Sequence, residues 1–193
     1  MKGNKKAYKK SETKNILHDR ITLAVILFVV AIIPIIVRLK VIEYPQNSGQ
    51  MIYDFFAYWK SIGLYIAAFI SIILILLNLK KGNIIFCREN KIFLILSGLY
   101  LIMCLFSAIM SEHKTTAILG YQGQSEGLLT IAAVFVIASL AALYNKNNIK
   151  RDLIFKFLYI SSIIIFIIGI FQFLGHDPFK AEIIKKLIIP KQY

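Results

Sequence analysis

The sequence predicts an all-α protein, a polytopic bundle of membrane helices, and two observations lead to that prediction. First, 58% of the 193 residues are hydrophobic. Second, these residues gather in five blocks of 17 to 22 residues with almost no charge inside. A helix rises about 1.5 Å per residue, so each block can cross a hydrocarbon layer about 30 Å thick. Membrane β-strands are shorter and alternate apolar with polar residues, which these blocks do not do.

The blocks and the segments between them give the organisation of the chain. Residues 1–20 form a basic leader, residues 21–174 the membrane domain and residues 175–193 a tail. The first block begins at Ile21 without a following A-x-A cleavage site, so it is predicted to stay as a span rather than to be removed as a signal peptide. We expect the five spans at residues 21–37, 61–79, 92–110, 127–144 and 153–174.

The lysine and arginine residues predict the orientation of these spans. One side has seven of them in 1–20, four in 80–91 and four in 145–156, and the other has three in 38–60, one in 111–126 and four in 175–193. Cytoplasmic loops carry the excess, so the N-terminus and the side with fifteen are predicted to be cytoplasmic. Because the net charge of +13 arises from loops that meet anionic headgroups, membrane lipids are expected as partners and nucleic acid is not.

Several residues inside the blocks predict how the helices pack. Pro34 interrupts the first span, and the carbonyl that it frees must be satisfied by a neighbouring helix or by water. Residues 127–144 are rich in alanine and serine, which allow close approach, so we expect this span inside the bundle. Residues 61–79 and 153–174 are dominated by Ile, Leu and Phe and are predicted to face lipid over more of their surface.

The cysteine and histidine residues give no sign of a disulfide or a metal site. Cys87 lies in a loop and Cys104 in the middle of a span, so the two are expected at different membrane depths. No paired Cys or His spacing is typical of a metal ligand set. We therefore expect no metal and no cofactor.

Three polar clusters stand out, and all three are predicted to face outward. They comprise residues 53–60, 111–127 and 172–180. Glycines in the second cluster let the backbone turn tightly or approach a ligand, and aromatic rings beside carboxylates and amides suit a sugar-binding surface. Each cluster also has a simpler interpretation: turn glycines, a helix cap at Glu126, solvated histidines at His113 and His176, and Tyr58 and Trp59 as interface anchors.

The same three clusters resemble segments of bacterial O-antigen ligases and polymerases. Residues 111–131, SEHKTTAILGYQGQSEGLLTI, are similar to a family stretch in which Ser leads to Ala-x-x-Gly and a Gly-rich loop ends in Glu-Gly-Leu before a span. Residues 54–60, DFFAYWK, look like the Asp-x-Phe-x-Tyr-Tyr-Lys run before the second span of the family. Residues 171–179, FQFLGHDPF, are similar to its Gln-Phe-x-Gly-x-Asp-Pro-Phe stretch.

This resemblance implies a metal-independent transfer or polymerisation of undecaprenyl-pyrophosphate-linked glycans on the outer face of a bacterial plasma membrane. The candidate contacts for the glycan or the lipid donor are Gln124, Glu126, Gly127, His176 and Asp177. No residue is assigned a catalytic role, because the outward loop with the family's catalytic Arg and His residues follows later spans. We therefore expect this chain to match the N-terminal half of such a protein, truncated before further spans, with a C-terminal half or a membrane partner to complete it.

One departure from the family and two other function classes complete the predictions. Gln124 stands where many relatives carry a basic residue, which weakens an anion-binding role there. The alternative function is a non-enzymatic multi-pass subunit or accessory protein of an envelope complex, because no complete catalytic constellation is present. A solute transporter is disfavoured, since no Asp, Glu, Arg or His lies deep in any predicted span.

Overall fold

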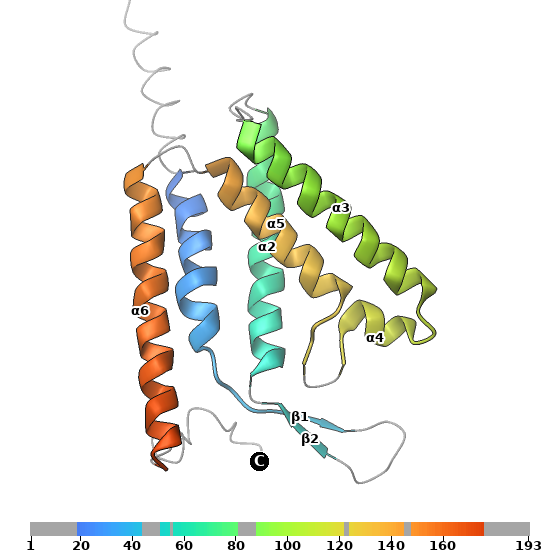
Figure 1. The fold of residues 1–193 in the computed structure, drawn as a ribbon, viewed down its shortest axis with the longest axis vertical. Coiled ribbons are helices and arrows are strands. Elements are labelled where there is room, and N and C mark those ends of the chain that lie inside the picture. Colours follow the sequence, from blue (N-terminus) through green and yellow to red (C-terminus); the bar gives the residue numbers. More distant parts are fainter. Residues whose placement is uncertain are drawn as a thin grey trace, which may run out of the picture.

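The computed structural model describes residues 19–43, 51–54, 56–80, 88–121, 124–144 and 148–175. These residues form a set of helices and one small two-stranded sheet (Figure 1). The first helical segment covers residues 19–35 and ends in a π-helix, η1 (Phe28–Ile32), and a 3-10 helix, η2 (Ile33–Ile35). The elements that follow are β1 (Lys40–Glu43), β2 (Met51–Asp54), α2 (Ala57–Lys80), α3 (Arg88–Met110), α4 (Lys114–Leu119), α5 (Leu128–Tyr144) and α6 (Asn148–Phe173).

Pro34 explains the irregular end of the first helical segment. Proline has no N–H, so the carbonyl of Val30, four residues earlier, loses its α-helical donor. The hydroxyl of Ser161 on α6 lies 3.2 Å from that carbonyl and 2.9 Å from the carbonyl of Leu158 in its own helix, so its one hydrogen is shared between the two acceptors. The N–H of Ile33 meanwhile bonds to the carbonyl of Phe28, five residues earlier, as a π-helix requires. The prediction that a neighbouring helix satisfies the freed carbonyl is therefore confirmed.

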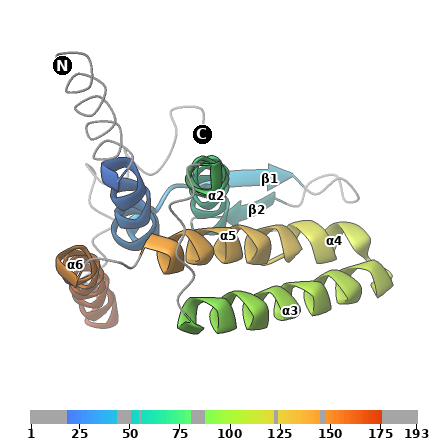
Figure 2. The ribbon, with the colours of Figure 1, turned by 90° about the horizontal axis from the view of Figure 1, so that it is seen from above.

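The core lies where the first helical segment, α2 and α5 meet. Its buried side chains are Val25, Ala67, Ala68, Leu74, Ala133, Ile137 and Leu140. Four of the seven are alanine or valine, and small side chains let helix backbones approach closely. Viewed from above, α5 lies between α2 and α3 (Figure 2). This position agrees with the expectation that residues 127–144 sit inside the bundle.

As predicted, α2 and α6 both expose more large apolar side chains than α5 does, but α2 also has a buried face that was not predicted. In its most apolar stretch, α2 has 22% of its residues buried, against 6% in α3 and 6% in α6. The buried residues of α2 are Gly63, Ala67, Ala68, Ser71 and Leu74. The physical reason is that these small side chains form the face that contacts α5 and the first helical segment. The Ile and Phe residues that dominated the sequence interpretation lie on its other faces.

Three of the described helices are long and apolar enough to cross a membrane. They are Ala57–Lys80, Asn90–Met110 and Arg151–Phe173, with mean hydropathies of 2.6, 2.5 and 2.5. A shorter apolar helix covers Leu128–Leu143. Large apolar side chains are exposed along α3 and α6, which water would not favour but hydrocarbon accepts. The helical prediction is confirmed in this form, as a helical protein with three potential membrane helices.

A short antiparallel hairpin between the first helical segment and α2 was not predicted. In its register Lys40 lies opposite Asp54 and Glu43 opposite Met51. The hairpin, α4 and the C-terminal end of α6 all lie toward the same end of the molecule (Figure 1). The C-terminal ends of α2 and α5 and the N-terminal ends of α3 and α6 lie toward the opposite end (Figure 1). The candidate site is found at the hairpin end.

Candidate functional site

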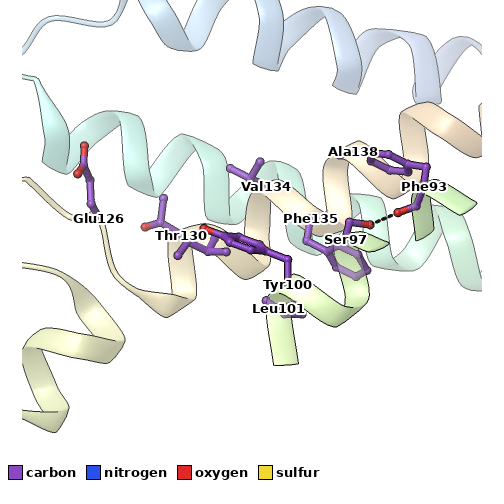
Figure 3. A pocket seen from close by; sticks show the side chains of 10 residues that line it. Phe93, Ser97, Tyr100, Leu101, Glu126, Thr130, Val134, Phe135 and Ala138 are labelled. Carbon is purple, nitrogen blue, oxygen red and sulfur yellow. Dashed lines mark hydrogen bonds between the residues drawn. The ribbon is translucent and has the colours of Figure 1, made fainter. Parts of the chain in front are cut away.

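An apolar groove lies between α3 and α5. Its volume is about 590 Å³. Apolar walls come from Phe93, Leu101, Ile131, Val134, Phe135 and Ala138, and polar atoms from Ser97, Tyr100, Glu126 and Thr130. Glu126 and Thr130 lie at one end of the groove, whereas Phe93 and Ala138 lie at the other (Figure 3). The hydroxyl of Ser97 donates to the carbonyl of Phe93 at 2.6 Å, so Ser97 is already satisfied within its helix. The polar chemistry of the groove is therefore concentrated at the Glu126 end.

Two glycines hold the loop that leads to this end. Gly120 has φ = 91°, a conformation that side chains rarely adopt. A Cβ atom added to Gly120 would lie 2.7 Å from the carbonyl carbon of Ser125. One added to Gly127 would overlap the backbone N of Gly120 and the carbonyl oxygen of Ile118. The start and the end of the loop thus cross at backbone contact, and Gly127, a predicted ligand contact, is a buried packing residue.

Hydrogen bonds join this loop to α5 and α2. The Thr130 hydroxyl donates to the carbonyl of Ser125 at 2.6 Å. The Tyr65 hydroxyl lies 2.9 Å from the same Thr130 oxygen. A threonine hydroxyl has one hydrogen, which Ser125 receives, so Tyr65 must be the donor in the second bond. This chain of bonds fixes the loop, and it accommodates Ser125 at φ = 50°.

Neither Tyr65 nor Thr130 was predicted from the sequence to belong to this site. Each lies in a long apolar block, where a lone hydroxyl is usually bonded within its own helix. Their partnership spans 65 positions in the chain. The sequence offers one signal: each of two separate apolar blocks has a hydroxyl-bearing residue about one helical turn after its start. Nothing in the sequence indicates that these two residues contact each other.

Glu126 is the predicted site residue that the structure leaves open for a ligand. Its side chain is exposed, and its carboxylate makes no hydrogen bond to any other residue that the structure describes. It precedes Gly127 and the start of α5, where the free N–H groups of a helix favour negative charge. Gln124 is also exposed, and its backbone N–H donates to the carbonyl of Tyr121 at 3.0 Å. Gln124 does not line the groove.

The other two candidates, His176 and Asp177, lie outside the described residues, as does Gly123. Two of the predicted contacts, Glu126 and Gly127, are adjacent in the chain, and the structure gives them different roles. Glu126 faces the groove, whereas Gly127 closes the loop. That the Glu126 loop and the segment with His176 and Asp177 both face outward stays a prediction.

Asp54, in the first polar cluster, has a structural role. It is 5% exposed, and its carboxylate accepts three backbone N–H groups at the start of α2. These bonds come from Phe56 at 2.9 Å, Ala57 at 2.8 Å and Tyr58 at 2.9 Å. Asp54 therefore caps α2, which is a common use of aspartate before a helix.

Among the described residues, no three His, Cys, Asp or Glu side chains are close enough to one another to hold a metal ion. Cys104 is a half-buried free thiol on α3, and Cys87 lies outside the described ranges.

These observations define a helical protein that has three helices able to cross a membrane and an apolar groove with a carboxylate at one end. No protein-family model, curated protein or solved structure matches the chain.

Proposed function

We propose that the chain is an O-antigen ligase/polymerase-like protein of bacterial cell-surface polysaccharide assembly. In this proposal it crosses the plasma membrane five times, with its N-terminus in the cytoplasm. It acts on undecaprenyl-pyrophosphate-linked glycans at the outer face, as the N-terminal part of a larger unit. The support comes from the three ordered sequence resemblances and from the groove between α3 and α5.

The chemistry of the groove suits a lipid that carries a sugar. A polyprenyl chain is a branched hydrocarbon, and it would lie against the apolar walls made by Leu101, Ile131 and Val134. Sugar hydroxyls would meet the open carboxylate of Glu126, which accepts hydrogen bonds strongly. The single observation that carries the proposal is this exposed carboxylate at the end of an apolar groove, which makes no hydrogen bond to another residue that the structure describes.

The reaction assigns a limited role to this chain. In glycan transfer, an acceptor hydroxyl attacks the anomeric carbon, the bond from that carbon to the pyrophosphate oxygen breaks, and a base removes the hydroxyl proton. The leaving pyrophosphate requires nearby cations, and no Lys or Arg lines the groove. We therefore assign binding and positioning of the donor to these residues, and the cations and the base to the part of the family that follows later spans.

Substitutions in the groove test this proposal. Val134→Trp should fill the groove and lower retention of undecaprenyl-pyrophosphate-linked saccharide about tenfold, since a lost hydrocarbon contact of this size costs about 1–2 kcal/mol. Glu126→Gln should lower the preference for the saccharide-bearing lipid over undecaprenyl phosphate. Native mass spectrometry of the full chain in lipid nanodiscs measures both.

Leu129→Trp is the matched control, because Leu129 is exposed on the same helix and does not line the groove. It should leave retention unchanged. Equal retention by Val134→Trp and the unmodified chain would contradict the groove as the lipid site. An unchanged lipid preference in Glu126→Gln would remove the role of its carboxylate.

The alternative function, a non-enzymatic membrane subunit, is favoured by one specific observation. Only 6% of the most apolar stretch of α6 is buried, so nearly its whole surface is available to another helix. A stoichiometric partner recovered in mild detergent, together with no retention of lipid-linked saccharide, would select this function over the first.

A further inference from the structure

Three basic side chains near the start of α2 each lie over an aromatic ring. The cation-to-centroid distances are 4.5 Å for Arg38 over Trp59, 5.2 Å for Lys40 over Tyr58 and 5.6 Å for Lys60 over Phe56. The Tyr58 and Trp59 rings themselves meet edge to face, with centroids 5.5 Å apart. The two rings therefore connect Arg38 and Lys40. We call these four residues, together with Lys60 and Phe56, the cation–aromatic cluster.

The hairpin assembles this cluster from two parts of the chain. Arg38 and Lys40 lie just before and at the start of β1, whereas the rings lie in and next to the first turn of α2. Strand pairing sets Lys40 opposite Asp54, three residues before the first residue of α2. In the sequence these cations look scattered over residues 38–60, and only the fold makes them neighbours.

Asp54, the carboxylate that strand pairing sets opposite Lys40, does not neutralise the cluster. Asp54 is buried, and its oxygens already accept the N–H groups of Phe56, Ala57 and Tyr58. No ion pair joins Arg38, Lys40 or Lys60 to a carboxylate among the residues that the structure describes. The cluster therefore has three cations that form no ion pair within the described part of the chain, and it attracts an anion.

Ring stacking leaves the cations able to bind that anion. The contact of Arg38 with the Trp59 ring occupies no hydrogen-bond acceptor, and among the described residues the guanidinium N–H groups stay available for two parallel bonds to phosphate oxygens. The half-buried ammonium of Lys40 keeps its three N–H donors beside Tyr58. Both sit at the end of a helix that can cross a membrane, the level at which lipid phosphates lie.

From this geometry we infer that the cation–aromatic cluster is a binding site for the phosphate of an anionic phospholipid headgroup. Arg38 and Lys40 hold the phosphate oxygens, and Trp59 and Tyr58 hold the two cations in place. The inference rests on α2 crossing the membrane and does not depend on the proposed glycan function.

The chain provides its own probe, because Trp59 is its only tryptophan. The full chain is placed in phosphatidylcholine nanodiscs, and a fixed fraction of the lipid is replaced by brominated phosphatidylglycerol or brominated phosphatidylcholine. Bromine quenches a tryptophan that it touches, so the ratio of the two quenching levels reports lipid preference at the cluster. We expect stronger quenching by brominated phosphatidylglycerol.

Two sets of variants decide whether the cations cause that preference. In the double variant Arg38→Gln and Lys40→Gln, the preference should fall about tenfold, since each cation near the surface contributes appreciably to anionic-lipid attraction. Lys80→Gln is the matched control, because Lys80 is an exposed cation at the opposite end of α2. It should keep the preference. If the double variant does not fold, Lys40→Gln alone gives the same comparison.

Other outcomes overturn the inference. Equal quenching by the two brominated lipids in the unmodified chain would show that the rings are interface anchors without headgroup selectivity. A preference that survives in the double variant would place the anion elsewhere. Loss of the preference when inorganic phosphate is added at millimolar concentration would assign the cluster to a free anion rather than to a lipid.

Discussion

At the residue scale, Ser161 shows how one side chain repairs the defect that a proline makes in a neighbouring helix. Its hydroxyl, on a residue that is 2% exposed, lies 2.9 Å from its own Leu158 carbonyl and 3.2 Å from the carbonyl of Val30. The rule that proline frees the carbonyl four residues earlier is local, so the need could be predicted from Pro34 alone. The donor could not, because it lies 131 positions away in the chain.

Ser161→Ala should therefore destabilise the contact between α6 and the first helical segment. The Val30 carbonyl would lose its partner in an apolar setting, so we expect a loss of about 1–2 kcal/mol in unfolding free energy, measured by denaturant titration in mixed micelles. Ser162→Ala is the control, since the exposed Ser162 bonds only to Leu158 of its own helix.

A double-mutant cycle with Pro34→Ala tests the cause of that loss. Alanine at position 34 supplies the missing N–H, so Ser161→Ala should cost clearly less in that background than in the unmodified chain. Equal costs in the two backgrounds would show that the hydroxyl acts by some route other than the proline.

At the scale of elements, the sequence predicts the long helices well and the short connections poorly. Blocks of 17 or more apolar residues give a strong signal, and each predicted block falls on a helical segment. Strands β1 and β2 have four residues each, too few for alternation to be distinguished from a loop. The hairpin was therefore missed, and with it the clustering of Arg38 and Lys40.

The burial of α2 was missed even though the sequence contains a usable signal. Gly63, Ala67 and Ser71 recur at every fourth position, and all three are buried. Small residues at this spacing form a helix face that admits another backbone. The composition of the block, rich in Ile and Leu, concealed that stripe. In contrast, the small residues of α5 were numerous enough to predict its central position.

The loop before α5 gives a prediction at this same scale. Gly127→Ala should destabilise the protein by about 1–3 kcal/mol, because the added methyl group would meet the rigid backbone of Ile118 and Gly120. Gly98→Ala in α3 should leave stability unchanged or raise it by up to about 1 kcal/mol, since nothing lies within 4 Å of the added atom and alanine favours helix. Thermal unfolding in one detergent compares them. Equal losses would mean that the loop crossing adapts freely.

At the scale of the whole molecule, the distribution of apolar surface and of charge predicts where the protein lies. Exposed Ile, Leu and Phe side chains cover α3 and α6, and a surface of that kind is stable in hydrocarbon. The two ends of the molecule differ in composition. Polar and glycine-rich segments lie at the hairpin end, whereas about half of the residues in the predicted cytoplasmic loops 80–91 and 145–156 are Lys, Arg or Asn. One orientation places the predicted side with more Lys and Arg residues in the cytoplasm and also agrees with the alternating directions of successive helices in Figure 1.

That orientation predicts a specific pattern of thiol labelling. Single cysteines are introduced at Gln124, in the loop before α5, and at Lys80, at the opposite end of α2, in a chain whose Cys87 and Cys104 are replaced by serine. Because the side with fifteen Lys and Arg residues is assigned to the cytoplasm, a membrane-impermeant maleimide should label Gln124→Cys in intact cells and Lys80→Cys only after lysis. The reverse pattern would turn the Glu126 end of the groove toward the cytoplasm. A lipid-linked glycan on the outer face would then be out of its reach.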